Sequence, residues 1–311
     1  MSYPPGAGRL GYADHVPGGE SGTALDLYGR PSLRRRVTNK LGWGACGAAV
    51  VVIAAPLVSV LWGVLGRAIP VWRWNVITKP GTGQGGGLEN EILGTLLLMA
   101  GVAICAGTVG ICAGIYLAEY ARGRSGSLLR GGSEVLAGIP SIVLGYVGYV
   151  ALTAGLHWQF SLAAALIALS ALTVPYIAKS TEASLRQVPT AYREAAEALG
   201  MSPLHAMRRV TLKAALPGIT TGLLVALAIS IGETAPLLYT AGFTDQLPSL
   251  ALTHAPVGYL TYAVWTFYNY PANAFQDLSY DAALILIALV LILILAARLV
   301  VAMTQRHSER N

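Results

Sequence analysis

Charged residues are scarce in this chain of 311 residues. They make up 12% of it, whereas soluble globular domains usually carry about 25%. Hydrophobic residues make up 54%, and they gather in several runs of roughly 20 residues, long enough for a helix to cross a bilayer. The net charge of +6 falls in short stretches between these runs, so it does not indicate nucleic-acid binding. We therefore expect an all-α polytopic membrane protein surrounded by lipid.

The residue types that metal and ATP chemistry need are also sparse. The three cysteines, Cys46, Cys105 and Cys112, lie inside apolar runs, where a buried, inert thiol is expected rather than a disulfide or a metal ligand. The five histidines show no ligand spacing. The loop Gly-x-x-x-x-Gly-Lys-Ser/Thr, which cradles ATP phosphates, does not occur. We expect no metal, no cofactor and no catalytic residue here, and a separate chain must hydrolyse any ATP that drives this protein.

The apolar runs predict six membrane spans. Residues 1–40 are rich in Gly, Pro, Ser and Arg without apolar periodicity, which indicates a disordered tail. The following run starts too late and is too long for a signal peptide, so it is expected to be retained. A transmembrane domain of residues 41–303 precedes a short tail, 304–311. Its expected spans cover about 42–66, 92–116, 134–155, 159–178, 216–239 and 281–303.

The distribution of Lys and Arg predicts the orientation. Of 21 such residues, only Arg67, Arg73 and Lys79 lie on one side of the expected spans. The positive-inside rule then places both termini in the cytoplasm of a plasma (inner) membrane, and the loop 240–280 outside. The aromatic residues of that loop predict an interfacial belt or a short helix lying on the membrane, or alternatively a docking surface for an external binding protein. They are Tyr259, Tyr262, Trp265, Phe267, Tyr268 and Tyr270.

A polar loop at 179–213 is too long for a simple turn and too polar to span the membrane. Good helix formers follow Pro189, and Gly200 suits the end of a helix because it tolerates a left-handed backbone. Ser202-Pro203 suits a new start, with Ser as N-cap and Pro in the first turn. The pattern predicts a helix, a turn and a second helix that protrude into the cytoplasm. They form either a partner-binding surface or an ordinary solvated hairpin.

The fifth expected span contains one acid, Glu233. Nine Leu, Ile and Val residues between Ile219 and Leu238 favour insertion by roughly 3 to 5 kcal/mol, and a central acid costs about 2.5 to 3.5 kcal/mol. Glu233 should therefore face protein or water rather than lipid. Pro236 cannot donate to the carbonyl of Gly232, so a kink beside the acid is expected. A stripe of small residues suited to close helix packing leads up to it: Gly218, Gly222, Ala226 and Ser230.

The polar loop resembles the cytoplasmic signature of ABC importer permeases. The similarity rests on Glu194-Ala195-Ala196, on Gly200 and on Val210-Thr211-Leu212, although Lys213 stands where that family has Pro. The resemblance implies a coupling helix that inserts into a groove on an ATPase subunit. The residues expected to form this contact are Glu194, Ala195, Ala196 and Gly200.

A narrower resemblance, to the A-type permeases of high-affinity phosphate (Pst) importers, rests on the run from Gly232 to Leu238. The segments Ile139–Val143, Ile115–Tyr120 and Val188-Pro189 are also similar to that family. The resemblance implies the six-span fold of a type I importer permease, forming half of a pathway for inorganic phosphate. The residues expected on this pathway are Ser141, Ser230, Gly232, Glu233, Thr234 and Pro236.

The same resemblance implies the partners: a second permease (PstC type), two ATPase subunits (PstB type) and an external phosphate-binding protein (PstS type). Many members carry Arg four residues before the acid, where this chain has Ile229. An ionised Glu233 would repel phosphate, so we expect the second permease to supply a cation.

Two alternatives remain open at this point. The cargo could be another oxyanion: phosphonate, sulfate or molybdate. A proton-coupled secondary carrier with Glu233 as its relay would explain the buried acid, but it gives the loop 179–213 no role. A membrane enzyme is disfavoured because the sequence has no cluster of His, Cys, Asp or Glu.

Overall fold

The structure is a computed structural model that describes residues 33–81, 86–121 and 123–308. The chain divides into two compact units, residues 1–60 and residues 61–311. The described part of the first unit is one helix, the beginning of α1 (Leu33–Val71). The expected tail falls outside the described residues up to position 32, and α1 begins at Leu33, before the expected start of the first span.

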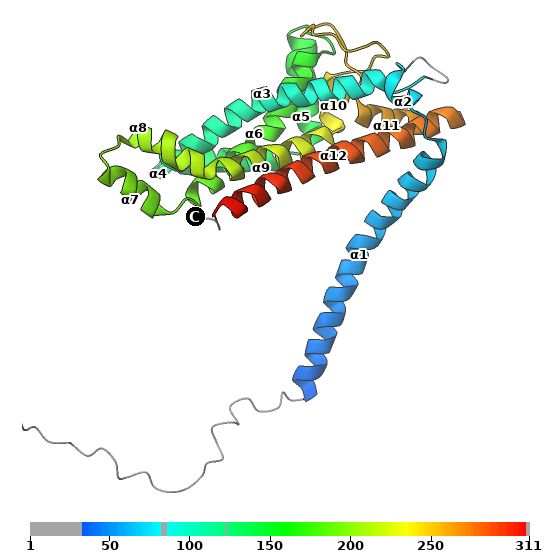
Figure 1. The fold of residues 1–311 in the computed structure, drawn as a ribbon. Coiled ribbons are helices and arrows are strands. Elements are labelled where there is room, and N and C mark those ends of the chain that lie inside the picture. Colours follow the sequence, from blue (N-terminus) through cyan, green and yellow to red (C-terminus); the bar gives the residue numbers. More distant parts are fainter. Residues whose placement is uncertain (1–32, 82–85, 122, 309–311) are drawn as a thin grey trace, which may run out of the picture. The chain divides into compact units, whose positions relative to one another are not determined.

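The second unit contains helices only, among the residues that the structure describes (Figure 1). Its longest helices are α3, α6, α9 and α12, and most of the shorter ones lie near their ends. After the end of α1 the elements are α2 (Asn75–Thr78), α3 (Glu89–Glu119), α4 (Gly123–Gly138), α5 (Ser141–Gly148), the π-helical η2 (Tyr149–Gly155), α6 (Leu162–Arg186), α7 (Thr190–Ala198), α8 (Pro203–Ala206), the π-helical η3 (Met207–Thr211), α9 (Leu212–Ile231), α10 (Ala235–Thr240), α11 (Leu260–Tyr268) and α12 (Asn273–Ser308).

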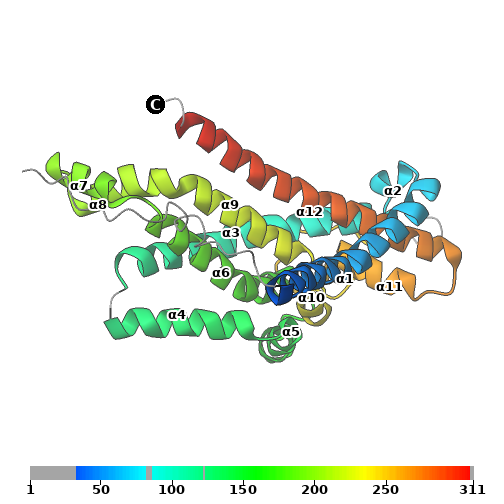
Figure 2. The ribbon, with the colours of Figure 1, turned by 90° about the horizontal axis from the view of Figure 1, so that it is seen from below.

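Among the described residues, five helical stretches are long and apolar enough to cross a membrane, and the number rises to six if a bent pair of helices is counted as one span. The bent pair is α4 with α5 and η2, and its two parts meet at 94°. Figure 2 shows α5 seen almost along its axis beside the end of α4. The expected third span, 134–155, therefore contains a sharp turn, which falls at Pro140, a residue that cannot donate a backbone hydrogen bond.

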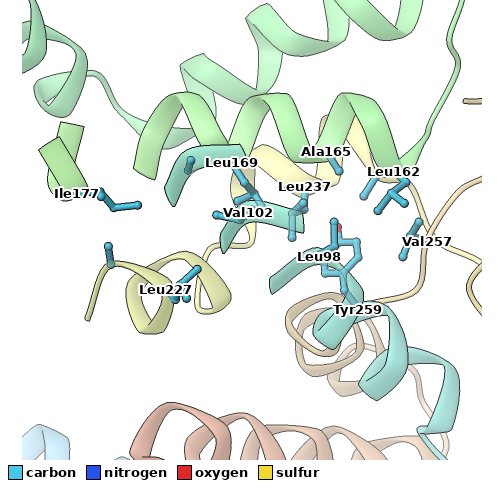
Figure 3. Close-up of a cluster of buried hydrophobic side chains, with 13 residues drawn as sticks. Leu98, Val102, Leu162, Ala165, Leu169, Ile177, Leu227, Leu237, Val257 and Tyr259 are labelled. Carbon is cyan, nitrogen blue, oxygen red and sulfur yellow. The ribbon is translucent and has the colours of Figure 1, made fainter. Parts of the chain in front are cut away.

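The core lies between α3, α6 and α9 (Figure 3). Leu98 and Val102 of α3 pack with Leu169 of α6 and Leu227 of α9, and all four are buried. Tyr259, from the segment before α11, closes this cluster and is 1% exposed. The core therefore joins segments that are far apart in the sequence and surrounds one end of α9.

Small residues allow α3, α6 and α9 to approach closely, and the sequence spacing predicted such an approach for α9. A Cβ at Gly110 of α3 would lie 2.7 Å from the Cβ of Ile177, and one at Gly114 would lie 2.6 Å from a backbone oxygen of α6. On α9, a Cβ at Gly222 would overlap Ser180 of α6. The expected stripe of small residues on α9 thus faces α6, and its last member, Ser230, is buried.

The cysteines differ from expectation. Cys46, Cys105 and Cys112 all lie on helices, but their side chains are exposed on the protein surface. The prediction of buried thiols is therefore wrong. An apolar run specifies that a helix enters the membrane, but it does not specify which of its sides faces other helices and which faces lipid. All three are free thiols.

Candidate translocation site and coupling hairpin

The fifth span is broken beside its acid. Helix α9 ends at Ile231 and α10 begins at Ala235, which leaves Gly232, Glu233 and Thr234 outside both helices. The proline in the first turn of α10 has no backbone N–H, so a continuous helix could not form its regular bonds here. We call residues 232–234 the helix break. The kink expected at this position is present as a full interruption.

Glu233 lies in the middle of the helix break with a half-buried side chain. Its backbone N–H donates to the carbonyl of Ser230 at 3.2 Å, and its own carbonyl accepts from the hydroxyl of Thr261 at 3.3 Å. Among the described residues its carboxylate forms no ion pair. The acid is thus fixed through its backbone, while its carboxylate remains available to a group outside the chain.

The other residues predicted for the pathway fall around this break. Ser230 and Pro236 are buried, Thr234 is half-buried, and Gly232 is exposed. Ser141 is the first residue of α5, which packs against α10: a Cβ at Gly145 would lie 2.6 Å from the Cα of Pro236. The structure therefore brings the segments of these residues together, and their role in transport stays a prediction.

A small cavity of about 10 Å³ lies next to the helix break. Ser230, Thr261 and Tyr259 line it, together with Leu98 and Leu237. A space of this size is close to the minimum for one water molecule. The buried hydroxyl of Tyr259 has no partner within the described residues, and burial raises the pKa of this phenol, so the group stays neutral.

The aromatic loop is not a uniform belt. Tyr259 is part of the core, and Tyr262 stacks on Phe243 with 4.3 Å between the ring centroids. Trp265, Tyr268 and Tyr270 are exposed, on or just after the short helix α11. The sequence alone could not separate these two groups, because aromatic side chains are common both in cores and at membrane interfaces.

The polar loop forms the expected hairpin. Helix α7 ends at Ala198, Gly200 follows with a φ of +73°, and α8 begins at Pro203. Ser202 occupies the N-cap position without a side-chain hydrogen bond to the helix. Glu194 and Ala195 are exposed, whereas Ala196 is 3% exposed because it packs within the chain. We call α7, α8 and the turn between them the coupling hairpin; of its predicted contact residues, Ala196 is not accessible.

An ion pair ties the coupling hairpin to α3. The guanidinium of Arg193 donates to both carboxylate oxygens of Glu119, at 2.9 and 2.6 Å. Nearby, Arg130 of α4 donates to Glu182 of α6 and to the carbonyl of Leu117, the latter at 2.8 Å. The last turn of α3 is therefore held by two arginines. Sequence analysis missed both contacts, because the paired residues lie 74 and 52 positions apart.

The described side chains contain no group of three or more His, Cys, Asp or Glu that could hold a metal ion. Two buried acids also escaped sequence analysis. Glu91, at the start of α3, is fully buried, and Asp281 of α12 is 2% exposed. Glu91 lies just before one expected span, and Asp281 is the first residue of the last expected span.

Residues 110–309 match the family model of binding-protein-dependent transport system inner membrane components, and the chain belongs to this family. It is a multi-pass inner-membrane protein and the permease component of a transport complex. Among curated relatives, the phosphate transport system permease protein PstA 2 of Mycobacterium bovis is 55% identical over 274 residues, which cover 88% of this chain and 91% of the relative. The corresponding PstA of Yersinia pestis is 39% identical over 227 residues, covering 73% of this chain and 76% of that one.

Solved structures confirm the fold class. The inward-facing methionine ABC transporter MetNI has a chain that superposes with a TM-score of 0.54 at 21% identity, covering 69% of this chain and 96% of that one. A bacterial ABC transporter that imports the acidic polysaccharide alginate gives the same TM-score at 14% identity, covering 85% and 98%. At these identities the similarity concerns the fold alone, which is that of a type I ABC importer permease.

Proposed function

We propose that this chain forms half of the translocation pathway of an ATP-driven importer for inorganic phosphate. The observation that carries the proposal is the 55% identity, over 88% of the chain, to a relative named as a phosphate transport permease. The geometry supports it in two ways. One span is interrupted at an acid that forms no ion pair with any residue the structure describes, and a separate hairpin extends from the ends of the long helices. Interrupted membrane helices often form transport sites, because their free backbone groups can contact an ion.

In this proposal the coupling hairpin faces the cytoplasm and contacts a separate ATPase subunit. Its exposed residues Glu194 and Ala195 are available to that partner, and Gly200 sets the turn between the two helices. The bond from Arg193 to Glu119 then connects the contact surface to α3, a span of 31 residues. ATP-driven movement of the ATPase subunits would reach the membrane through this connection.

Phosphate and an ionised Glu233 repel each other, so the proposal needs a cation. Ile229, one helical turn before the acid, supplies none, and no Lys or Arg occurs between Ala214 and Ala297. We assign the cation to a second permease, with Glu233 either holding it in place or carrying a proton. A partner permease without any cationic residue along the pathway would contradict this assignment.

The test is phosphate uptake into proteoliposomes that contain the co-purified complex, with ATP inside and the external binding protein outside. We expect Glu194→Arg to uncouple or release the ATPase, because it reverses a charge on the exposed face of α7. Glu233→Gln should leave the complex intact and reduce uptake at least tenfold. Uptake driven by a proton gradient, without any ATPase bound, would instead identify a secondary carrier. Saturating sulfate, molybdate or phosphonate that abolishes uptake of labelled phosphate would indicate a different cargo.

A further inference from the structure

A polar cavity of about 380 Å³ lies at the opposite end of the second unit from the coupling hairpin. One wall is the segment 70–76, at the end of α1 and the start of α2, and the other is the beginning of α12. Figure 1 shows α2 beside the start of α12, at the end far from α7 and α8. Of the described residues that line the cavity, three are charged: Arg73, Asp277 and Asp281. We call it the acidic pocket.

Asp281 is the unusual member of the acidic pocket. The residue is 2% exposed, and its Oδ1 is buried without a hydrogen-bond partner in the part of the chain that the structure describes. Asp277 precedes it by one helical turn, so both carboxylates lie on the same face of α12. A buried carboxylate is costly unless it is paired and hydrogen-bonded. Arg73 is exposed, and no ion pair within 4.0 Å joins it to either aspartate among the described residues.

The walls of the acidic pocket indicate what kind of cation fits. Pro70, Val71 and Trp72 make one side apolar, and the carboxylates lie across from them on α12. A bare metal ion would use only the carboxylates, and the described residues offer no third acidic, His or Cys ligand beside them. A lysine or arginine side chain uses both features, because its aliphatic stem packs on apolar surface while its charge meets an acid or the face of an aromatic ring.

The position of the acidic pocket indicates where its occupant comes from. The first residues of α12, from Asn273 to Asp281, are largely polar, and the continuous apolar run starts at Ala282. At 1.5 Å per residue, this polar stretch extends about 13 Å beyond the apolar run. In the proposed orientation it projects outside the cell. The family is described as binding-protein-dependent, so a protein partner acts on that side.

We propose that the acidic pocket receives a lysine or arginine side chain of the external binding protein when that protein docks. The proposal rests on the proposed function, since it needs that partner and that orientation. Asp281 forms the base of the site and Asp277 lies one turn nearer the end of the helix. Trp72 supplies the apolar wall, and Arg73 limits the negative charge near the pocket.

The test measures ATPase stimulation of the reconstituted complex against increasing concentrations of its purified binding protein. We expect Asp281→Asn and Asp277→Asn each to raise the half-saturating concentration about tenfold with little change in the maximal rate. Arg73→Glu should change it in the other direction, lowering the half-saturating concentration, because it removes a positive charge beside the pocket and adds a negative one. Opposite effects of neighbouring substitutions are not expected from a loss of folding.

Asp245→Asn is the matched control, because it removes an acid from the loop before α11 that is exposed and does not line the pocket. Its half-saturating concentration should stay within twofold of wild type. Unchanged half-saturation in both α12 variants, or an equal shift in Asp245→Asn, would overturn the pocket while leaving the proposed function intact. A wild-type complex that no binding protein stimulates would overturn both. A shift that follows added Ca²⁺ in wild type and vanishes in Asp281→Asn would assign the pocket to a metal ion instead.

Discussion

The two ends of the transmembrane bundle are held together in different ways. All four ion pairs found among the described residues involve positions from Glu119 to Arg193, at the end that carries the coupling hairpin. Around the helix break, contacts are made by close backbone packing and by hydroxyls, such as Gly145 against Pro236 and Thr261 to Glu233. The hairpin end is thus held by ion pairs between long side chains, whereas the contacts around the helix break depend on close packing and on hydroxyl groups.

This difference bears on movement. An arginine and a carboxylate can stay paired while their helices shift by an ångström or more, because the long arginine side chain can adjust. A glycine packed against a neighbouring backbone cannot adjust in this way, because the contacting atoms are fixed in their helices. We therefore expect substitutions in the packed contacts beside the break, such as that of Gly145 with Pro236, to act on stability. Substitutions at the hairpin should instead act on coupling between ATP hydrolysis and transport.

The largest effect is expected for Gly145→Ala. The new methyl group would lie 2.6 Å from the Cα of Pro236, so α5 and α10 must separate, at a typical cost of 1–3 kcal/mol for overpacking, on the order of values seen in other cores. The loss of stability is measured by thermal unfolding of the complex in detergent, together with phosphate uptake. Gly131→Ala on α4 is the control: nothing lies within 4 Å of its Cβ, so a better helix former should be neutral or slightly stabilising there. Equal melting temperatures for the two variants would contradict the importance of this contact.

A smaller effect is expected for charge reversal at the hairpin. Charge-assisted bonds contribute about 1.5–3 kcal/mol. Arg193 is 36% exposed and Glu119 15%, so solvent screening reduces this to about 1 kcal/mol. Arg193→Glu and Glu119→Arg should each lower phosphate uptake per ATP hydrolysed about fivefold. The double variant should recover most of it, because the pair is restored in reverse.

Arg193→Lys separates charge from geometry, since lysine keeps the charge but lacks the fork that contacts both carboxylate oxygens. An intermediate ratio of transport to hydrolysis is expected. If the reversed pair fails to recover while Arg193→Lys behaves as wild type, then Arg193 contacts a partner rather than Glu119.

The smallest effect is expected for Lys179 and Glu134, which form an ion pair at the same end. Their atoms are 3.6 Å apart, and the side chains are 73% and 67% exposed. Such pairs contribute about 0–1 kcal/mol, so exchanging the two residues should change neither stability nor coupling measurably. A coupling defect as large as that of Arg193→Glu would show that net charge at this end matters, and not a particular bond.

Local sequence signals predicted much of this molecule. Apolar runs identified the spans, Gly200 and Pro203 identified the hairpin, and Pro236 identified the interruption of the fifth span. Each of these features depends on residues close together in the chain, so that propensity and spacing are sufficient. The small residues at every fourth position of α9 also predicted a close contact with another helix. They did not predict that this helix is α6.

What sequence analysis missed depends on tertiary structure. The bond between Arg193 and Glu119 joins separate elements, and no local pattern marks either residue as a partner. Tyr259 and Trp265 have similar chemistry, yet one is in the core and the other is exposed. The buried oxygen of Asp281, which has no hydrogen-bond partner among the described residues, can be recognised only once the residues around it in the folded chain are known.

The tight contact between α3 and α6 has a consequence for the transport cycle. Where Gly110 meets Ile177 and Gly114 meets Thr181, the helices are interlocked by side chains that fit only opposite glycine. Sliding one helix along the other would bring larger residues, such as Ile111, towards these positions. We therefore expect α3 and α6 to move together as one rigid body, with Glu119 at the end of α3. The hinge of any opening movement should then lie elsewhere. The helix break and the sharp turn at Pro140 are the positions where the chain is already bent.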